Sequence, residues 1–228
     1  MPQPSISIIV PARNEESTVA GLLENLCAAG ADEILLVDGA STDRTVEIAS
    51  VYSEVRVIAA AACRAVQMNA GAEAARGDVL LFLHADVRLS DGALAGLRAA
   101  MSDASRIGGN FDIRYDGEDW VCRIFDWVNR WRRFAGIFYG DSGIFCRRNV
   151  FVAMGGYQPW PILEDYEFAR RLWKTGRLAF LRAPLRVSDR RWRNAGLFTT
   201  MWQWVAIQGL YTLGVSPVRL VKWYEDIR

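Results

Sequence analysis

The chain has 228 residues, enough for one α/β domain with a substantial core and too few for two ordinary domains with separate functions. Lysine and arginine number 27 against 26 aspartates and glutamates, so the net charge of +1 favours neither nucleic acid nor an acidic polymer as partner. Any anionic ligand must be bound locally.

The cysteines and the histidine restrict the kinds of metal or redox site that the chain can form. The four cysteines lie far apart and form no C-x-x-C pair, which disfavours a zinc ribbon or a redox dithiol and indicates thiols in a reducing compartment. The single histidine excludes a multi-histidine metal centre. Because neither a basic segment nor a small-residue cleavage site accompanies the first apolar run, we expect no secretory signal and a cytoplasmic location.

The first part of the chain alternates apolar runs with helical patterns. The run Ile6–Val10 stops at Pro11, as expected for a parallel strand buried on both faces. Strands are predicted at Ile6–Val10, Glu33–Asp38, Val55–Ile58 and Val79–Leu83, and helices from Ser17, at Thr42–Val51 and at Cys63–Ala75. This order requires right-handed crossovers, a mostly parallel sheet flanked by helices, and a site at the carboxyl ends of the strands.

The pattern is less regular in the second part of the chain. Helices are predicted at Asp91–Met101, Glu118–Phe134 and Glu164–Thr175, an extended segment at Arg106–Tyr115, and a glycine-rich turn into a strand at Tyr139–Phe145. All nine tryptophans lie at or beyond Trp120. We therefore expect the second half of the chain to contact a partner or ligand that the first half does not contact.

The segment 194–218 contains no charged residue, a length that would suffice to span a bilayer. Threonines, glutamines and three glycines make it a poor span, whereas Trp202, Trp204 and Tyr211 are residues that favour a membrane interface. Two interpretations stay open: an interfacial helix or helical hairpin that docks on lipid, or ordinary core packing against the helix predicted at Glu118–Phe134.

Polar residues directly follow three of the predicted strands. They are Arg13 to Glu16, Asp38 to Asp43, and His84 with Asp86. All three groups should converge on one crevice, although such residues are also ordinary turn and cap residues. Neither G-x-G-x-x-G nor a P-loop is present, so a nucleotide would be held differently. The Asp38 carboxylate could accept a hydrogen bond from a base or ribose, while Arg13 or Arg64 could neutralise phosphate.

His84-Ala85-Asp86 is the candidate metal site. Residues i and i+2 of an extended strand project to the same side, so both side chains could face one ligand. One carboxylate and one imidazole suit Mn²⁺ somewhat better than Mg²⁺, and the ion would bridge two phosphates. The alternative is an ordinary histidine at a strand end.

Four segments together resemble the family-2 glycosyltransferases of the GT-A fold. They are Pro11-Ala12-Arg13-Asn14-Glu15, Val37-Asp38-Gly39-Ala40-Ser41-Thr42-Asp43, Phe82-Leu83-His84-Ala85-Asp86 and Leu163-Glu164-Asp165-Tyr166-Glu167-Phe168. Their order and spacing agree over roughly residues 5 to 192. With the histidine that opens the third triplet, the segment Arg64–Gly71 further resembles a bacterial subgroup described as associated with radical-SAM or selenium-domain proteins.

This resemblance implies roles for the donor side of the site. Pro11, Ala12 and Glu15 would line the nucleotide pocket, and Asp38 would hold the base or ribose. Asp86 matches the metal-binding carboxylate that ends the D-x-D motif of the family, whereas His84 replaces its usual first aspartate.

The resemblance also implies the base of an inverting reaction. Asp165 matches the residue that deprotonates the acceptor hydroxyl, and Glu164 is its neighbour. In-line attack at the anomeric carbon needs a base opposite the leaving phosphate, although two carboxylates also make a good helix start.

Two further motifs are matched less fully. The segment 188–192 resembles the Q-x-x-R-W motif of processive synthases with serine replacing glutamine, so Arg190 and Arg191 would contact the diphosphate and Trp192 the acceptor site. Asp141, with Tyr139 and Gly140, matches residues near the donor sugar and acceptor.

The sequence thus predicts a GT-A domain over residues 1–192, a Rossmann-like mostly parallel sheet flanked by helices, and a helical extension over 193–228. Its predicted activity is inverting, metal-dependent transfer from a nucleotide sugar to an unassigned acceptor, and docking of 194–218 on lipid would favour a lipid-linked one. The alternatives are a non-catalytic module that binds nucleotide sugars, and a nucleotidyltransferase, which the lack of a glycine-rich basic loop after the first strand disfavours.

Overall fold

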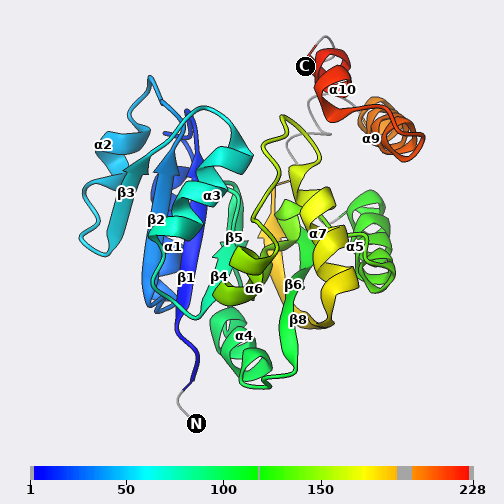
Figure 1. The fold of residues 1–228 in the computed structure, drawn as a ribbon. Coiled ribbons are helices and arrows are strands. Elements are labelled where there is room, and N and C mark those ends of the chain that lie inside the picture. The colour runs from blue at the N-terminus through cyan, green and yellow to red at the C-terminus, as the bar shows by residue number, and fades with distance from the viewer. Residues whose placement is uncertain (1–2, 118, 189–196, 226–228) are drawn as a thin grey trace.

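The computed structural model describes residues 3–117, 119–188 and 197–225 of the chain. They form an eight-stranded sheet with helices on both faces (Figure 1). Across the sheet the strands run in the order β3 (Val55–Ala59), β2 (Glu33–Asp38), β1 (Ile6–Ala12), β4 (Val79–Phe82), β7 (Ile144–Arg147), β6 (Arg106–Tyr115), β8 (Arg177–Val187) and β5 (Val87–Leu89). Within this sheet β7 and β5 are antiparallel to their neighbours and the remaining pairs are parallel, which confirms the predicted mostly parallel sheet.

Successive residues of each strand face opposite sides of the sheet, so both faces carry apolar side chains and both are covered by helices. They are α1 (Val19–Ala28), α2 (Thr45–Ala49), α3 (Arg64–Ala74), α4 (Ala93–Met101), α5 (Trp120–Arg132), α6 (Arg148–Ala153), α7 (Glu164–Thr175), α9 (Leu197–Thr212) and α10 (Pro217–Glu225), with 3₁₀ turns η1 (Arg133–Ala135) and η2 (Gly140–Ser142). On β1, Ile8 and Val10 join a core beneath α1 and α4, whereas Ile9 joins a second core beneath α3 and α7. The sheet therefore separates two hydrophobic cores.

Several predicted elements are confirmed at their bounds, and others were missed. The extended segment Arg106–Tyr115 and the helix Glu164–Thr175 are β6 and α7. The helix predicted at Thr42–Val51 is shorter, because Asp43 accepts hydrogen bonds from the Thr45 N–H and hydroxyl and holds the preceding residues in a turn. The sequence pattern did not predict β5, α6 or β8, and β8 carries a proline, exposed arginines and a register shift against β6.

The carboxy-terminal helices α9 and α10 lie at the end of the molecule opposite the N-terminus, beyond α5 and α7 (Figure 1). In the part of the chain that the structure describes, no helix has both the length and the apolar character needed to cross a bilayer. The described side chains of α9 contact Tyr139, Trp160 and Tyr166. The helix therefore packs against α7 and the segments that flank it.

A buried glutamine ties the ends of β1 and β2 together. Gln67 on α3 is only 4% exposed, and its Nε2 donates to the Ala12 and Val37 carbonyls at 2.8 and 2.7 Å. A Cβ at Gly39 would lie 2.8 Å from the same nitrogen, so the backbone at Gly39 packs directly against the Gln67 side-chain amide. Gln67 thus fixes the point where the polar loops begin.

Replacing this amide should destabilise the fold. We expect Gln67→Leu to lower the free energy of unfolding by about 1–3 kcal/mol, because two buried carbonyls lose their donor. Urea denaturation followed by circular dichroism measures the change. The surface variant Ser50→Ala, which removes an exposed hydroxyl hydrogen bond to Val46, should cost under about 0.5 kcal/mol. Equal costs for the two variants would contradict the bridging role of Gln67.

Candidate functional site

The loops after β1 and β2 are joined by hydrogen bonds at the carboxyl edge of the sheet. The Asn14 Oδ1 accepts from the Thr42 N–H at 2.8 Å, and the Glu15 N–H donates to the Thr45 hydroxyl at 2.7 Å. Asn14 and Ala40 have φ values of 56° and 61°, a left-handed conformation that costs energy in residues other than glycine. The two polar groups predicted to converge after these strands therefore do meet.

A cleft of about 490 Å³ opens beside these loops, between β1, β4, η2, α7 and α9. Eight predicted site residues line it: Pro11, Glu15, Arg64, His84, Asp86, Asp141, Glu164 and Asp165. Three others, Ala12, Arg13 and Asp38, do not belong to its lining. Arg190, Arg191 and Trp192 lie outside the described residues.

Asp38 has a structural role in its own turn. Its carboxylate is 8% exposed, and both oxygens accept from the Ser41 N–H at 3.2 Å. This is the turn-forming use of aspartate considered as an alternative at this position. A contact with base or ribose would have to be made by a carboxylate already engaged with its own backbone.

His84 and Asp86 both line the cleft, but not in the extended geometry expected from the sequence. β4 ends at Phe82, and the Val87 N–H donates to the His84 carbonyl at 3.2 Å, so Ala85 and Asp86 form a turn. The alternation argument for the pair was therefore wrong, because the strand stops before His84. A turn nonetheless brings both side chains to the same wall of the cleft.

The donor set at this wall fits a cation shared with a ligand. Among the described residues, no group of three or more histidines, cysteines and acidic residues is arranged to hold a metal ion. His84 and Asp86 would therefore supply two ligands at most, and water and phosphate oxygens the rest. Mg²⁺ bound with nucleotides typically has this coordination, with one or two protein ligands and several waters.

The backbone of η2 orients Asp165, which also lines the cleft. Its Oδ2 accepts from the Gly140 N–H at 2.7 Å and its Oδ1 from its neighbour Tyr166 N–H at 2.7 Å. Leu163, with φ at 61°, turns the chain sharply into α7, whose N-terminal dipole favours carboxylates. A Cβ at Gly140 would clash with the His84 Nε2 and lie 3.1 Å from the Asp165 Oδ2, so only glycine fits between the histidine and Asp165.

Glu164 is a buried acid beside Asp165. It is 2% exposed, and the Arg64 guanidinium lies 3.3 Å from its Oε1. Burial, and next the Asp165 carboxylate, raise the pKa of Glu164 to about 7, against the opposing effect of Arg64. The charge of the cleft therefore changes near neutral pH.

An aromatic cluster closes the cleft towards α9. The Arg132 guanidinium carbon lies 4.6 Å above the Tyr139 ring, which stacks on Tyr166 at 5.5 Å between centroids. The Tyr139 hydroxyl donates to the Gln208 Oε1 at 2.6 Å, and burial raises the pKa of Tyr139 to about 12. Arg132 and Gln208 also line the cleft, yet sequence reasoning missed both because no motif marks them.

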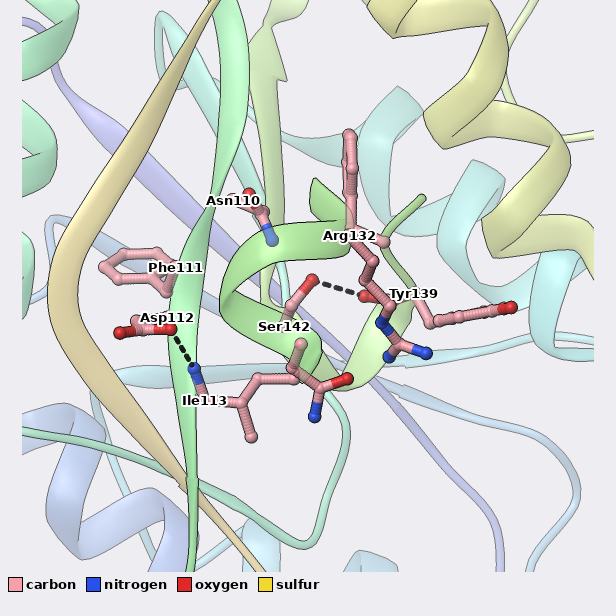
Figure 2. Close-up of a pocket in the computed structure, with 9 residues that line it drawn as sticks. Asn110, Phe111, Asp112, Ile113, Arg132, Tyr139 and Ser142 are labelled. Carbon is pink, nitrogen blue, oxygen red and sulfur yellow. Dashed lines mark hydrogen bonds between the residues drawn. The ribbon is translucent and has the colours of Figure 1, made fainter. Parts of the chain in front are cut away.

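A second cavity behind η2 is too small for a substrate (Figure 2). Its volume is about 10 Å³, and it lies between Asn110 and Asp112 of β6 and the Ser142 hydroxyl, which donates to the Tyr139 carbonyl at 2.6 Å. Figure 2 shows Arg132 and Tyr139 side by side, and both residues also line the large cleft. The small cavity thus belongs to the packing that supports the cleft wall.

The raised pKa of Glu164 predicts a pH-dependent stability. Below the ordinary pKa of about 4.5 the acid is neutral in both states, and stability is lost as pH rises through about 7, because the folded chain must then ionise a buried group. Glu164→Gln stays neutral, so it should unfold like the parent near pH 5 and be more stable by roughly 2–3 kcal/mol near pH 9. Chemical denaturation at both pH values measures this difference.

The matched control is Glu47→Gln, since Glu47 is exposed and paired with Arg44 on the surface. It should show no gain in stability at high pH. A Glu164→Gln effect of equal size at both pH values would mean that Glu164 is ionised throughout the range.

Comparison with known proteins agrees with this geometry. The model of "Glycosyl transferase family 2" matches residues 7–154. The PGL/p-HBAD biosynthesis glycosyltransferase of Mycobacterium bovis is 30% identical over 181 residues, which cover 74% of this chain and 69% of that protein. The beta-monoglucosyldiacylglycerol synthase of Nostoc sp. is 25% identical over 201 residues, covering 74% of this chain and 41% of that synthase.

Solved structures share the fold. TarS of S. aureus in complex with UDP-GlcNAc is 18% identical and has a TM-score of 0.68, covering 95% of this chain and 69% of that chain. A mannosyltransferase from Pyrobaculum calidifontis, in complex with GDP-Man and Mn²⁺, is 20% identical with a TM-score of 0.67, over 83% of this chain and 57% of its own. The chain thus spans little more than half of that mannosyltransferase. Together with the family match, this GT-A-like α/β fold establishes that the chain is a glycosyltransferase of family 2.

Proposed function

We propose that the chain transfers a sugar from a nucleoside-diphosphate sugar to an acceptor hydroxyl, with inversion and with a divalent metal. The observation that carries this proposal is that a candidate metal pair and an oriented carboxylate share one cleft. His84, Asp86 and Asp165 all line it, and the Gly140 N–H fixes the Asp165 carboxylate close to the His84 ring. In an inverting reaction the sugar would lie between the leaving diphosphate, held by the metal, and the attacking hydroxyl, held by Asp165.

The donor side would use the loop after β1 and the turn after β4. Pro11 and Glu15 offer the edge for the nucleoside, and Arg64 or Arg132 a guanidinium for a phosphate. Bound Mn²⁺ or Mg²⁺ would neutralise the charge that grows on the departing diphosphate. His84 and Asp86 are the residues we assign to hold that ion.

The acceptor side would use Asp165 as general base. Two backbone N–H groups fix its carboxylate, so it needs no rearrangement to accept the proton of an incoming hydroxyl. Because the pKa of Glu164 is raised to about 7, this neighbour carries less negative charge next to the base at neutral pH than an ordinary carboxylate would. Asp141 of η2 lines the same cleft and would contact the sugar.

The region beyond residue 192 would complete the acceptor side. We treat residues 1–192 as the GT-A domain and 193–228 as an extension whose α9 covers the cleft. Ile207 and Val221 give this wall apolar side chains, which suits a lipophilic or lipid-linked acceptor. In this proposal 194–218 also makes peripheral membrane contact on the cytoplasmic side, and all four cysteines are free thiols, as a reducing compartment requires. We also propose that the chain belongs to the subgroup associated with radical-SAM or selenium-domain proteins, because the segment Arg64–Gly71 and His84 resemble it.

Donor and metal binding can be measured before any acceptor is known. A thermal-shift panel of nucleotide sugars, with and without Mn²⁺, should show stabilisation by one donor that is largest when the metal is present. EDTA should remove the metal-dependent part in the parent, and Asp86→Ala should lack that part altogether. The exposed variant Asp91→Ala is the control. A metal response unchanged in Asp86→Ala would refute the assigned ligand.

The base is tested by hydrolysis of, or transfer from, the donor identified in that panel. Asp165→Asn should lower kcat about 100- to 10,000-fold while donor binding stays within a few-fold of the parent, because the amide has the same shape and keeps one of the two backbone hydrogen bonds but cannot accept the proton. Release of nucleoside diphosphate measures turnover. Full activity of Asp165→Asn would overturn the assignment, and donor binding without any turnover in the parent would point to a non-catalytic binding module.

A further inference from the structure

The helix α5 points its apolar side away from the protein. Six large apolar side chains on α5 and η1 are 39–69% exposed: Trp120, Ile124, Trp127, Val128, Trp131 and Phe134. At about 100° per residue they occupy one arc of roughly 120°. We call this set the α5 apolar face. The opposite side of α5 faces the sheet, where Cys122 and Asn129 are buried.

The α5 apolar face continues onto α7. Trp173 is 43% exposed, and a Cβ at Gly136, just after η1, would lie 2.7 Å from its ring. The rings of Trp131 and Phe134 lie 6.0 Å apart, which joins the middle of the face to this end. Monomeric soluble proteins seldom expose a continuous apolar patch of this kind without a use for it.

Charge around the face indicates what covers it. Arg123 and Arg130 flank the arc on one edge and Arg132 flanks it on the other, by the same helical spacing. Arg130 pairs with the buried Asp112 while its side chain stays 47% exposed, and Arg132 lies over the Tyr139 ring, so Arg123 is the charge most available to a headgroup. The one acidic residue of α5, Asp126, lies off the arc and accepts from the Tyr115 N–H. The face is therefore aromatic at its centre and basic at its edges, the pattern of a helix that lies in a bilayer interface with anionic lipid.

A second copy of the chain fits this face less well. In a symmetric dimer each face would meet itself, so the flanking arginines would approach arginines. No acidic side chain of α5 lies on the arc to pair them. Anionic lipid headgroups would supply negative charge opposite the arginines, and the tryptophan rings would lie at the boundary between headgroups and acyl chains.

We propose that the α5 apolar face docks the enzyme on the surface of an anionic membrane. The cleft is next to this face, because Arg132 lines the cleft and belongs to the last turn of α5. Docking would bring the mouth of the cleft close to the headgroups. The proposal places the principal membrane contact on α5 and a lesser one on 194–218, and it holds whatever the donor and acceptor are.

Vesicle flotation of the full chain tests it. The parent should float with vesicles of phosphatidylcholine mixed with phosphatidylglycerol, and less with phosphatidylcholine alone. Trp127→Ser with Trp131→Ser should weaken binding at least about tenfold, because two interfacial rings are lost. Arg123→Gln should weaken it roughly fivefold at low salt and little at high salt, because one of the charges that attract anionic headgroups is removed and salt screens the rest.

Two further pairs serve as controls. Val51→Ser with Val152→Ser removes apolar side chains that are 80% and 71% exposed elsewhere, and this variant should float like the parent. Trp202→Ser with Val205→Ser removes exposed side chains of α9 and should have a smaller effect than the α5 pair. Thermal melts should show that all variants stay folded, since every substituted residue is at the surface.

Three outcomes would overturn the proposal. The parent could fail to float with anionic vesicles. The Trp202 and Val205 variant alone could lose binding, which would place the membrane contact on α9. Light scattering could show a parent dimer that the Trp127 and Trp131 variant converts to a monomer, which would mean that a second copy covers the face.

Discussion

The hydrogen bond from the Gly140 N–H to the Asp165 carboxylate joins parts of the cleft that are distant in sequence. η2 supplies the donor, α7 the acceptor, and the turn after β4 packs the His84 ring against the same glycine. No side chain fits at position 140 without moving one of these partners. The relative placement of His84 and Asp165 therefore depends on η2, a short backbone segment that is held by the hydrogen bond from the Ser142 hydroxyl to the Tyr139 carbonyl.

Much of the sheet could be predicted because its strands have strong local signals. Continuous apolar runs mark β1, β2 and β4, and the parallel order that follows from the helices between them brings their polar ends to one edge. β8 could not be predicted in this way. Its arginines and Pro184 interrupt any alternation, and it forms because β6 offers a long parallel partner with room for a register shift. Pairing across more than sixty residues has no signature in a local window.

The site shows the same division between local and long-range causes. Glu15, His84 and Asp86 line the cleft as expected of residues after the strands, because their position depends on the topology. Asp141, Glu164 and Asp165 also line it, but they were identified by their resemblance to family motifs and not by topology. The turn at Ala85 and Asp86 was missed, because where β4 stops is decided by its pairing and not by hydropathy. Asp38 was the reverse case. A carboxylate in the expected place turned out to be engaged by the Ser41 N–H of its own turn.

The uncharged segment 194–218 was expected either to dock on lipid or to pack as core, and the described part of α9 shows why neither interpretation alone fits. Gln208 and Tyr211 contact the aromatic residues around Tyr139, while Trp202 and Val205 face outward. One side of α9 therefore borders the cleft, and its other side is exposed.

The two sides of the cleft differ in polarity, and this difference has a directional consequence. Glu164 and Asp165 offer oxygen, whereas Ile207 and Val221 offer carbon. A molecule with a hydroxyl at one end and a hydrocarbon tail at the other would lose favourable contacts if it entered reversed. If the acceptor is such a molecule, the cleft would select its orientation before the transfer reaction begins.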